Sequence, residues 1–317
     1  MAAMHGHAHH DHGHAHGAGH GHGHHHAPPD SARAFAIGIA LNIAFVTLEA
    51  GAGIVADSVA LLADAGHNRS DVLGLIVAWV GATLAKRPPS PRYTYGMGGS
   101  SILAALANAV LLLAASGAIA WEAVRRFADP PPVPGTTVML VAAVGIVINF
   151  ATAMLFARGR EGDLNIRGAY LHMMADAAVS AAVVGAGLAI WWTGARWIDP
   201  LASLLVVAVI LWSTWGLLKE SVAMALQAVP RGIDPAAVER ALAAQAGVTA
   251  VHDLHIWPMS TTEVAMTAHM VMPAGHPGDV FLHHLQHRLA HDFGIGHATV
   301  QIEIGEADCT LEPATRV

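Results

Sequence analysis

Two stretches of this sequence each carry a histidine and an aspartate four residues apart. The pairs are His67 with Asp71 and His172 with Asp176, and each lies within a long apolar run. Residues four apart lie on the same face of a helix, so each pair offers an imidazole nitrogen and a carboxylate oxygen to one point. Two such helices would supply the four ligands that tetrahedral Zn2+ takes. We therefore predict one metal site shared by both pairs; two unrelated polar pairs, each satisfied by neighbouring helices or water, are the alternative.

The charges of this predicted site have a consequence for transport. Two carboxylates, two neutral imidazoles and a divalent cation sum to zero. An empty pair of carboxylates away from water would take up protons, so metal binding would expel them and couple metal to proton movement. Asp64 lies three residues before His67 and could be an entry ligand, a proton relay or a partner for Arg69.

The elements that must position these residues are long and apolar. Of the 317 residues, 54% are hydrophobic and 12% are charged, whereas a soluble domain carries roughly 25% charged residues. This composition excludes an ordinary soluble enzyme, a disordered chain and a coiled coil. Six stretches approach or exceed the roughly 20 apolar residues that a membrane span needs: 34–55, 58–85, 100–124, 136–157, 165–193 and 198–218. We predict an α-helical membrane protein with six transmembrane helices over residues 33–218.

The distribution of lysine and arginine predicts the orientation of these spans, because cytoplasmic loops are enriched in both. If the N-terminus is cytoplasmic, nine such residues flank the spans inside and three outside. The inside set is Arg33, Lys86, Arg87, Arg92, Arg158, Arg160, Arg167, Lys219 and Arg231, and the outside set is Arg125, Arg126 and Arg196. We expect both chain termini in the cytoplasm.

Residues 1–32 form a low-complexity tail that we expect to be disordered. Twelve of the 23 histidines lie between His5 and His26, interleaved with glycine and alanine. This interleaving favours a native segment over a cloning tag, and the tract lacks the pattern of a signal peptide. Adjacent imidazoles bind metal weakly, so the tail would raise the metal concentration near the cytoplasmic mouth. The single cysteine, Cys309, excludes a disulfide framework.

Residues 219–317 read as a small cytoplasmic α+β domain. Helices are predicted over 234–246 and 278–293, and strands over 248–257, 262–272 and 297–304. The order α-β-β-α-β suits one helical layer on one sheet.

The sequence resembles the cation diffusion facilitator family of metal transporters after residue 32. The resemblance is carried by Asn42 to Glu49, residues 57–68, Asp71, His172 with Asp176, Asp199-Pro200 and residues 251–257. It implies a homodimer of six-span protomers with a metallochaperone-like cytoplasmic domain, exporting divalent metal against protons by alternating access. The family's transport-site residues would be His67, Asp71, His172 and Asp176, as in zinc carriers. Arg69 departs from common members, as does the absence of a histidine-rich loop between spans four and five.

The resemblance also points to regulatory metal in the small domain. His252 and His269 match positions that bind it in some members, but Gln301 and Glu303 stand where others have histidine and aspartate. We predict a looser site of His252, His269 and Glu303, with His255 and His287 as further candidates. In an ideal strand, residues 252 and 255 point to opposite faces, so a bulge would be needed to join them.

Three other functions are weighed against zinc export. A net charge of -7 with only 16 lysines and arginines argues against nucleic-acid binding. An intramembrane metalloenzyme would need an open coordination position and a general base, but no span carries His-Glu-x-x-His, so we expect no enzyme. A sensor that never transports leaves the ligands inside the membrane unexplained. Cobalt, nickel and cadmium remain alternatives to zinc, and the expected location is a bacterial inner membrane.

Overall fold

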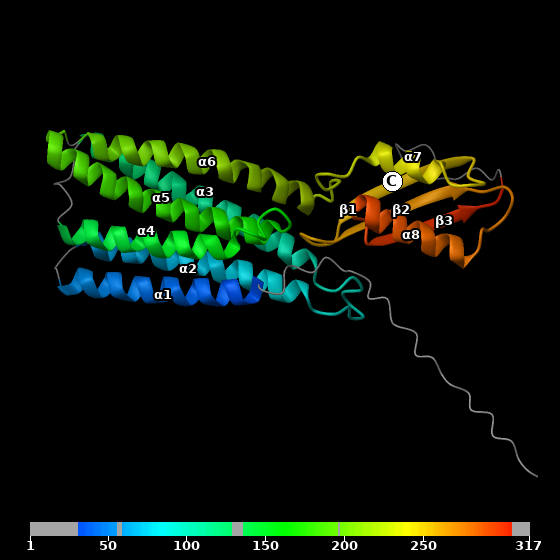
Figure 1. Cartoon of the computed structure of the whole chain (residues 1–317), viewed down its shortest axis with the longest axis horizontal. Coiled ribbons are helices and arrows are strands. Elements are labelled where there is room, and N and C mark those ends of the chain that lie inside the picture. The colour runs from blue at the N-terminus through cyan, green and yellow to red at the C-terminus, as the bar shows by residue number, and fades with distance from the viewer. Residues whose placement is uncertain (1–30, 56–58, 129–135, 196, 306–317) are drawn as a thin grey trace, which may run out of the picture.

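A computed structural model of the chain describes residues 31–55, 59–128, 136–195 and 197–305. It consists of a bundle of long helices and a small mixed domain at one end of that bundle (Figure 1). The histidine-rich tail and Cys309 lie outside the described residues.

Six helices lie side by side in the bundle. They are α1 (Ser31–Val55), α2 (Val59–Ala85), α3 (Gly99–Ala128), α4 (Thr136–Phe156), α5 (Leu164–Thr193) and α6 (Ile198–Ala225). Five of them are long and apolar enough to cross a membrane, and in α2 the apolar part that qualifies among the described residues is Val72–Ala85. The prediction of membrane helices is confirmed for these five, while a sixth span in α2 stays a prediction.

The outer surface of the bundle is apolar, as expected of a protein in lipid. Trp191, Trp192 and Trp212 are 80%, 90% and 87% exposed, and Trp197 is also exposed between α5 and α6. Tryptophan is enriched where a membrane protein meets the polar lipid headgroups. These features identify an integral membrane protein.

Helix α6 continues to Ala225 rather than ending at residue 218 as predicted. The prediction placed the end where the apolar run stops. Glu220 extends the helix beyond that point because its carboxylate pairs with Arg167 of α5 at 2.9 Å and with Arg231 at 3.3 Å. The chain then turns at Gln227, whose φ of 60° is left-handed.

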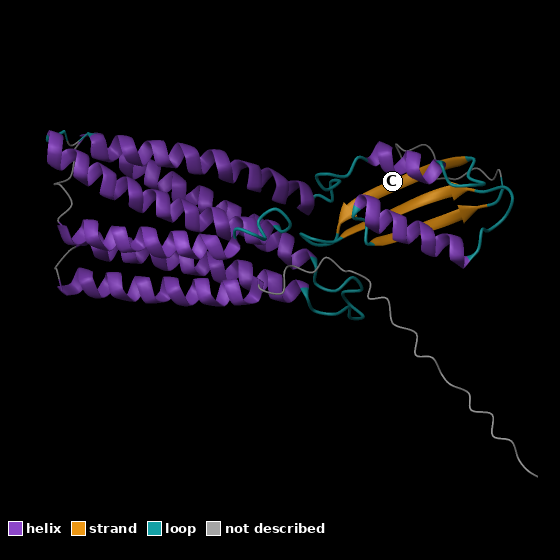
Figure 2. Cartoon of the chain, viewed as in Figure 1, coloured by secondary structure: helices purple, strands orange, loops and turns teal. Residues whose placement is uncertain are grey.

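The small domain has the predicted α-β-β-α-β order. Its elements are α7 (Pro235–Ala243), β1 (Ala250–Pro258), β2 (Val264–Val271), α8 (Asp279–Phe293) and β3 (His297–Glu303). In the sheet, β2 is central, antiparallel to β1 and parallel to β3 (Figure 2). The carboxylate of Asp234 caps α7 by accepting from the Ala236 amide at 3.0 Å, as the aspartate-proline start of the helix predicts.

Both helices of this domain pack against one face of its sheet. Met266, Ala268 and Met270 alternate along β2 and are buried with Val238 of α7 and Leu285 of α8. Because side chains alternate across a strand, the residues between them point to the opposite face. His269 therefore lies on the sheet face that the helices leave open.

Candidate metal centre

The histidine and aspartate of α5 are buried within the bundle. His172 Nε2 lies 3.8 Å from Asp176 Oδ2, and the two side chains are 6% and 12% exposed. The four-residue spacing thus places both groups on one helix face, as predicted. An imidazole and a carboxylate turned inward in a membrane bundle are candidates for an ion-binding function.

Helix α2 lies close to His172 at Gly74. A Cβ atom at Gly74 would lie 3.8 Å from Cε1 and Nε2 of His172, and 3.3 Å from Oδ1 of Asn108 on α3. Gly74 comes three residues after Asp71, which is about one helical turn. The backbones of α2 and α5 are therefore close enough to contribute to one site near His172.

The predicted α2 half of the site falls on side chains that lie outside the described part of the chain. Residues 64, 67 and 71 are all within helix α2. The convergence of His67 and Asp71 with the α5 pair stays a prediction, as does the role of Asp64. Arg69, in the same helix, is exposed.

Two polar residues of α1 connect it to neighbouring helices, as expected for buried polar groups in a bundle. Asn42 Nδ2 donates to the Gly38 carbonyl at 2.9 Å and contacts Met173 Sδ of α5 at 3.5 Å. Glu49 Oε2 accepts from Asn68 Nδ2 of α2 at 2.7 Å. These contacts join α1 to both helices of the predicted site.

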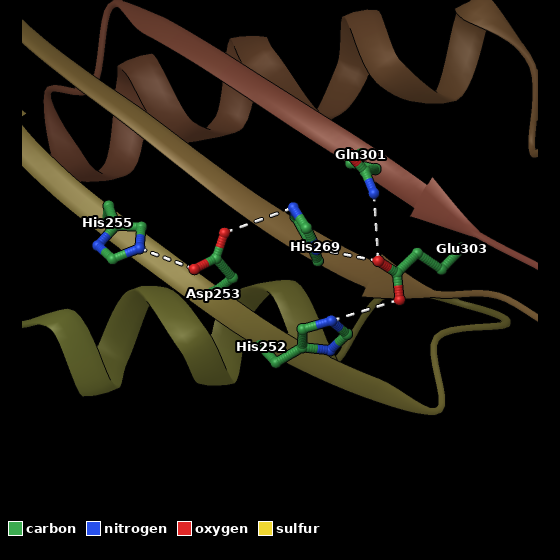
Figure 3. A network of polar contacts seen from close by, with 6 residues as sticks. All are labelled: His252, Asp253, His255, His269, Gln301 and Glu303. Carbon is green, nitrogen blue, oxygen red and sulfur yellow. Dashed lines mark hydrogen bonds and ion pairs between the residues drawn. The ribbon is translucent and has the colours of Figure 1, made fainter. Parts of the chain in front are cut away.

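A second candidate site lies on the open face of the small domain's sheet. Imidazole and carboxylate atoms of His252, His269 and Glu303 all lie within 4.8 Å of one another. Glu303 Oε1 is 2.9 Å from His269 Nδ1, and its Oε2 is 3.3 Å from His252 Nε2 (Figure 3). Two imidazoles and one carboxylate fit Zn2+, with a fourth position left for water or another ligand.

The sheet register explains how three strands contribute to this cluster. His252 of β1 pairs with His269 of β2, and β3 runs parallel to β2 with Gln301 beside His269 and Glu303 beside Val271. Cross-strand partners share a face, so His252, His269, Gln301 and Glu303 all point away from the helices. The side chains of His252, His269 and Glu303 are no more than 18% exposed. They are therefore already partly ordered, which lowers the loss of conformational entropy when they bind metal.

Asp253, to which the sequence analysis assigned no role, lies next to this cluster. Strand β1 has an irregular register between His252 and His255, and Asp253 has a left-handed φ of 50°. Its Oδ2 lies 3.5 Å from His269 Nε2. Metal-bound histidines commonly donate their second N–H to a carboxylate, which fixes the tautomer and ring orientation. Asp253 is placed to do this for His269, leaving Nδ1 directed at Glu303.

The other predicted residues of this site lie outside the cluster. His255 donates to Asp253 Oδ1 at 2.8 Å and is 40% exposed, so the bulge connects it to the site only through Asp253. His287 lies on the exposed side of α8, with its ring stacked on His291 at 6.3 Å. Gln301 is exposed and donates from Nε2 to Glu303 Oε1 at 3.2 Å.

The turn between β1 and β2 contacts the bundle where α3 and α5 begin. Thr261 donates from its backbone amide to Ser101 Oγ at 3.0 Å and from its hydroxyl to Asp163 Oδ1 at 3.2 Å. Asp163 also caps α5 by accepting from the Asn165 amide at 2.7 Å. Burial raises the pKa of the Asp163 carboxyl, although hydrogen bonds to Asn165 and Thr261 and the nearby Lys86 oppose the shift.

Comparisons with known proteins match both parts of the chain. The model of the cation efflux transmembrane domain matches residues 35–224, and that of the cation efflux protein cytoplasmic domain matches residues 230–304. The metal cation efflux system protein CzcD of Cupriavidus metallidurans is 35% identical over 282 residues, or 89% of each chain. The zinc transporter ZitB of Escherichia coli is 36% identical over 276 residues, or 86% of this chain and 88% of that one.

Two further comparisons concern a related antiporter and a solved domain. The cadmium, cobalt and zinc/H(+)-K(+) antiporter of Bacillus subtilis is 34% identical over 264 residues, or 82% of this chain and 85% of that one. The metal-bound C-terminal domain of the CzcD transporter is 39% identical and covers 22% of this chain and 99% of that structure, with a TM-score of 0.21.

Proposed function

The chain belongs to the cation efflux family, and from that membership we propose that it exports a divalent metal cation, preferentially Zn2+, in exchange for protons. The similar proteins named as a zinc transporter and as a cadmium, cobalt and zinc antiporter support this class of substrate. Cobalt, nickel or cadmium as the preferred ion is the alternative within the same class, because histidine and aspartate ligands suit several of these metals.

The observation that carries the proposal is the buried pair of His172 and Asp176 on α5, with His172 beside Gly74 of α2. The α2 backbone lies beside His172 at Gly74, and Asp71 and His67 precede Gly74 by about one and two helical turns. Zn2+ is held by these four residues, two from each helix, as the transported substrate. A closed set of four protein ligands suits binding and release rather than catalysis.

Proton exchange follows from the charges of the ligands. When the cation leaves, His172, Asp176 and their partners on α2 are left with uncompensated negative charge in a medium of low dielectric constant, so they take up protons. When the next cation binds, the protons leave. Asp64, near His67 in the sequence, serves as a proton relay or as an entry ligand. Alternating access of the site to the two sides of the membrane converts this exchange into antiport.

The cluster on the small domain serves as a regulatory zinc site. His252, His269 and Glu303 provide three ligands, and Asp253 orients His269 through Nε2. Zinc there would join three strands and stabilise the sheet face that the helices leave open. The histidine-rich tail of residues 5–26 raises the local metal concentration. The protein functions as a homodimer in a bacterial inner membrane with both termini in the cytoplasm.

Purified protein in liposomes with an internal zinc-sensitive dye tests the proposal. We expect zinc uptake into the liposomes when a pH gradient is imposed. Uptake should be at least about a hundredfold slower in His172→Ala and Asp176→Ala, because each removes a proposed metal ligand and losing only an outer partner of such a ligand costs about 10–100-fold. His287→Ala, which removes an exposed histidine of α8, is the matched control and should transport normally. Uptake that ignores a pH gradient of either sign would exclude antiport, and no uptake by the wild type would favour a non-transporting sensor.

A further inference from the structure

A buried amide next to the predicted transport site has no partner among the described residues. Asn108 lies in the middle of α3 and is 1% exposed. Neither Nδ2 nor Oδ1 of its side chain has a hydrogen-bond partner there. Within a membrane bundle, an unsatisfied amide costs free energy because lipid supplies no replacement hydrogen bonds. No contact in the described structure explains why a polar residue stands at this position.

The amide of Asn108 lies between two glycines, one on α5 and one on α2. A Cβ atom at Gly168 of α5 would lie 2.6 Å from Nδ2, and one at Gly74 of α2 would lie 3.3 Å from Oδ1. The same position at Gly74 is 3.8 Å from His172 Nε2. The Asn108 oxygen and the His172 imidazole therefore both lie beside residue 74 of α2, which carries no side chain.

A second amide oxygen extends this polar line toward the small domain. Asn165 of α5 is 1% exposed and donates from Nδ2 to the Ser101 carbonyl at 3.0 Å, but its Oδ1 has no partner among the described groups. Residues 165, 168, 172 and 176 recur on one face of α5. Two unsatisfied amide oxygens thus lie between His172 and the end of the bundle that contacts the small domain.

We propose that Asn108 is a further residue of the cation path, and that its Oδ1 contacts the divalent cation or a water bound to it between the small-domain end of the bundle and His172. This inference rests on the proposed transport function. A neutral amide oxygen is a suitable intermediate ligand, because it replaces part of the hydration shell of a divalent cation without adding a charge that would hold the ion.

The test compares transport with stability, since the proposal expects the protein to keep its stability while its apparent affinity for zinc falls. Asn108→Leu replaces the amide with two methyl groups on a side chain that branches at the same atom. Thermal unfolding of the purified protein should then stay unchanged or shift upward, because an unsatisfied group is gone. The apparent KM for zinc in the liposome assay should rise about tenfold, which corresponds to about 1.4 kcal/mol.

A matched control shows whether the change in KM is specific to Asn108 or follows the loss of any buried polar group. Thr152 of α4 is also buried, its hydroxyl also has no partner among the described groups, and it packs against Gly38 of α1. Thr152→Val removes that hydroxyl at similar volume and should leave the apparent KM unchanged. Asn108→Asp keeps an oxygen ligand and adds charge, so it should lower the apparent KM or change the order of preference among zinc, cobalt and cadmium.

The outcomes separate this inference from the function on which it rests. One outcome would overturn only the role of Asn108: the wild type transports zinc, His172→Ala does not, and Asn108→Leu transports with an unchanged KM. Absence of transport by the wild type would overturn the proposed function and this inference together. If Asn108→Leu does not fold, Asn108→Asp decides. A lower KM or a changed order of metal preference supports the proposal, and an unchanged or higher KM with the same preference would overturn it.

Discussion

The carboxylate of Glu303 is the only negative charge between the two imidazoles of the small-domain cluster, among the residues that the structure describes. Its oxygens face His269 Nδ1 at 2.9 Å and His252 Nε2 at 3.3 Å. Glu303→Gln keeps the size of the side chain but replaces the charged oxygen with a neutral amide, which is a poor zinc ligand. We expect zinc affinity at this site to fall at least about tenfold, a loss similar to or larger than that for removing an outer partner of a metal ligand.

The zinc affinity of Glu303→Gln can be measured by competition with a fluorescent chelator, in a protein that lacks only residues 5–26. The deletion removes the weak metal sites expected in the tail. The transport site is present both in Glu303→Gln and in the parent protein, so it contributes equally to the two measurements. The matched control is Asp292→Asn, because Asp292 is an exposed carboxylate of α8 that accepts from His291 at 2.8 Å. Equal zinc affinity in Glu303→Gln and the parent chain would exclude Glu303 as a ligand.

The residues of this cluster differ in how far the sequence could predict them. His252, His269 and Glu303 were predicted from the resemblance and from strand periodicity, and the parallel register of β3 brings them together. Asp253 was missed, because a strand pattern places it on the helix-covered face. Only the left-handed backbone at Asp253 turns its carboxylate toward His269, and periodicity does not encode such a bulge.

At the scale of elements, the contact between α2 and α3 depends on a glycine. A Cβ atom at Gly81 would overlap the Cβ of Ala104 and lie 3.1 Å from the Ser100 carbonyl oxygen. Ser100 Oγ also donates to the Gly81 carbonyl at 3.0 Å. Gly81→Ala must therefore separate the two helices. We expect destabilisation of about 1–3 kcal/mol, the usual cost of overpacking, measured as a lower thermal unfolding temperature in detergent.

The control for this substitution lies in α3 itself. A Cβ atom at Gly117 would meet nothing within 4 Å, so Gly117→Ala should be neutral or stabilising, since alanine is favoured over glycine by about 1 kcal/mol within a helix. Equal unfolding temperatures for Gly81→Ala and the wild type would contradict the close α2–α3 contact.

The helices themselves were largely predictable, whereas their contacts were not. Runs of apolar residues predicted α1, α3, α4 and α5 nearly to their ends. The end of α6 was misplaced because Glu220 is held by arginines from two other segments, and composition does not reveal such pairs. Asn108 was present in the third predicted span as an isolated polar residue, which is a signal of function in membranes, but its position beside Gly74 and His172 depends on how three helices pack.

At the scale of the whole molecule, the two parts of the chain meet at one small polar joint. Thr261 of the β1–β2 turn contacts Ser101 at the start of α3 and Asp163 at the start of α5. Gly98 permits this approach, since a Cβ atom there would lie 2.7 Å from the Met259 carbonyl. Strand β1 runs from His252, in the small-domain cluster, to this turn, so the joint connects the proposed regulatory site to the helix that carries His172 and Asp176.

Protonation of Asp163 makes this joint sensitive to pH. Burial raises the pKa of its carboxyl above the ordinary value, which is about 3.9, so the folded protein binds a proton at this group more readily than the unfolded chain does. The stabilisation that this group provides is complete below the unfolded pKa and is lost as the pH rises through the folded pKa. Asp163→Asn imitates the protonated carboxyl and keeps an oxygen to accept from Asn165 and Thr261.

We therefore expect the unfolding temperature of Asp163→Asn to equal that of the wild type at low pH and to exceed it by a few degrees at pH 8, since about 1 kcal/mol shifts the midpoint by roughly 2–4 °C in a chain of this size or slightly smaller. The measurement is the difference between the two proteins across pH, because titrating groups that do not interact with residue 163 contribute equally to both. Glu161→Gln, which neutralises an exposed carboxylate two residues earlier, should show no such divergence. Parallel pH profiles for Asp163→Asn and the wild type would mean that burial does not favour the protonated form of Asp163. The joint would then stabilise the protein only through its hydrogen bonds.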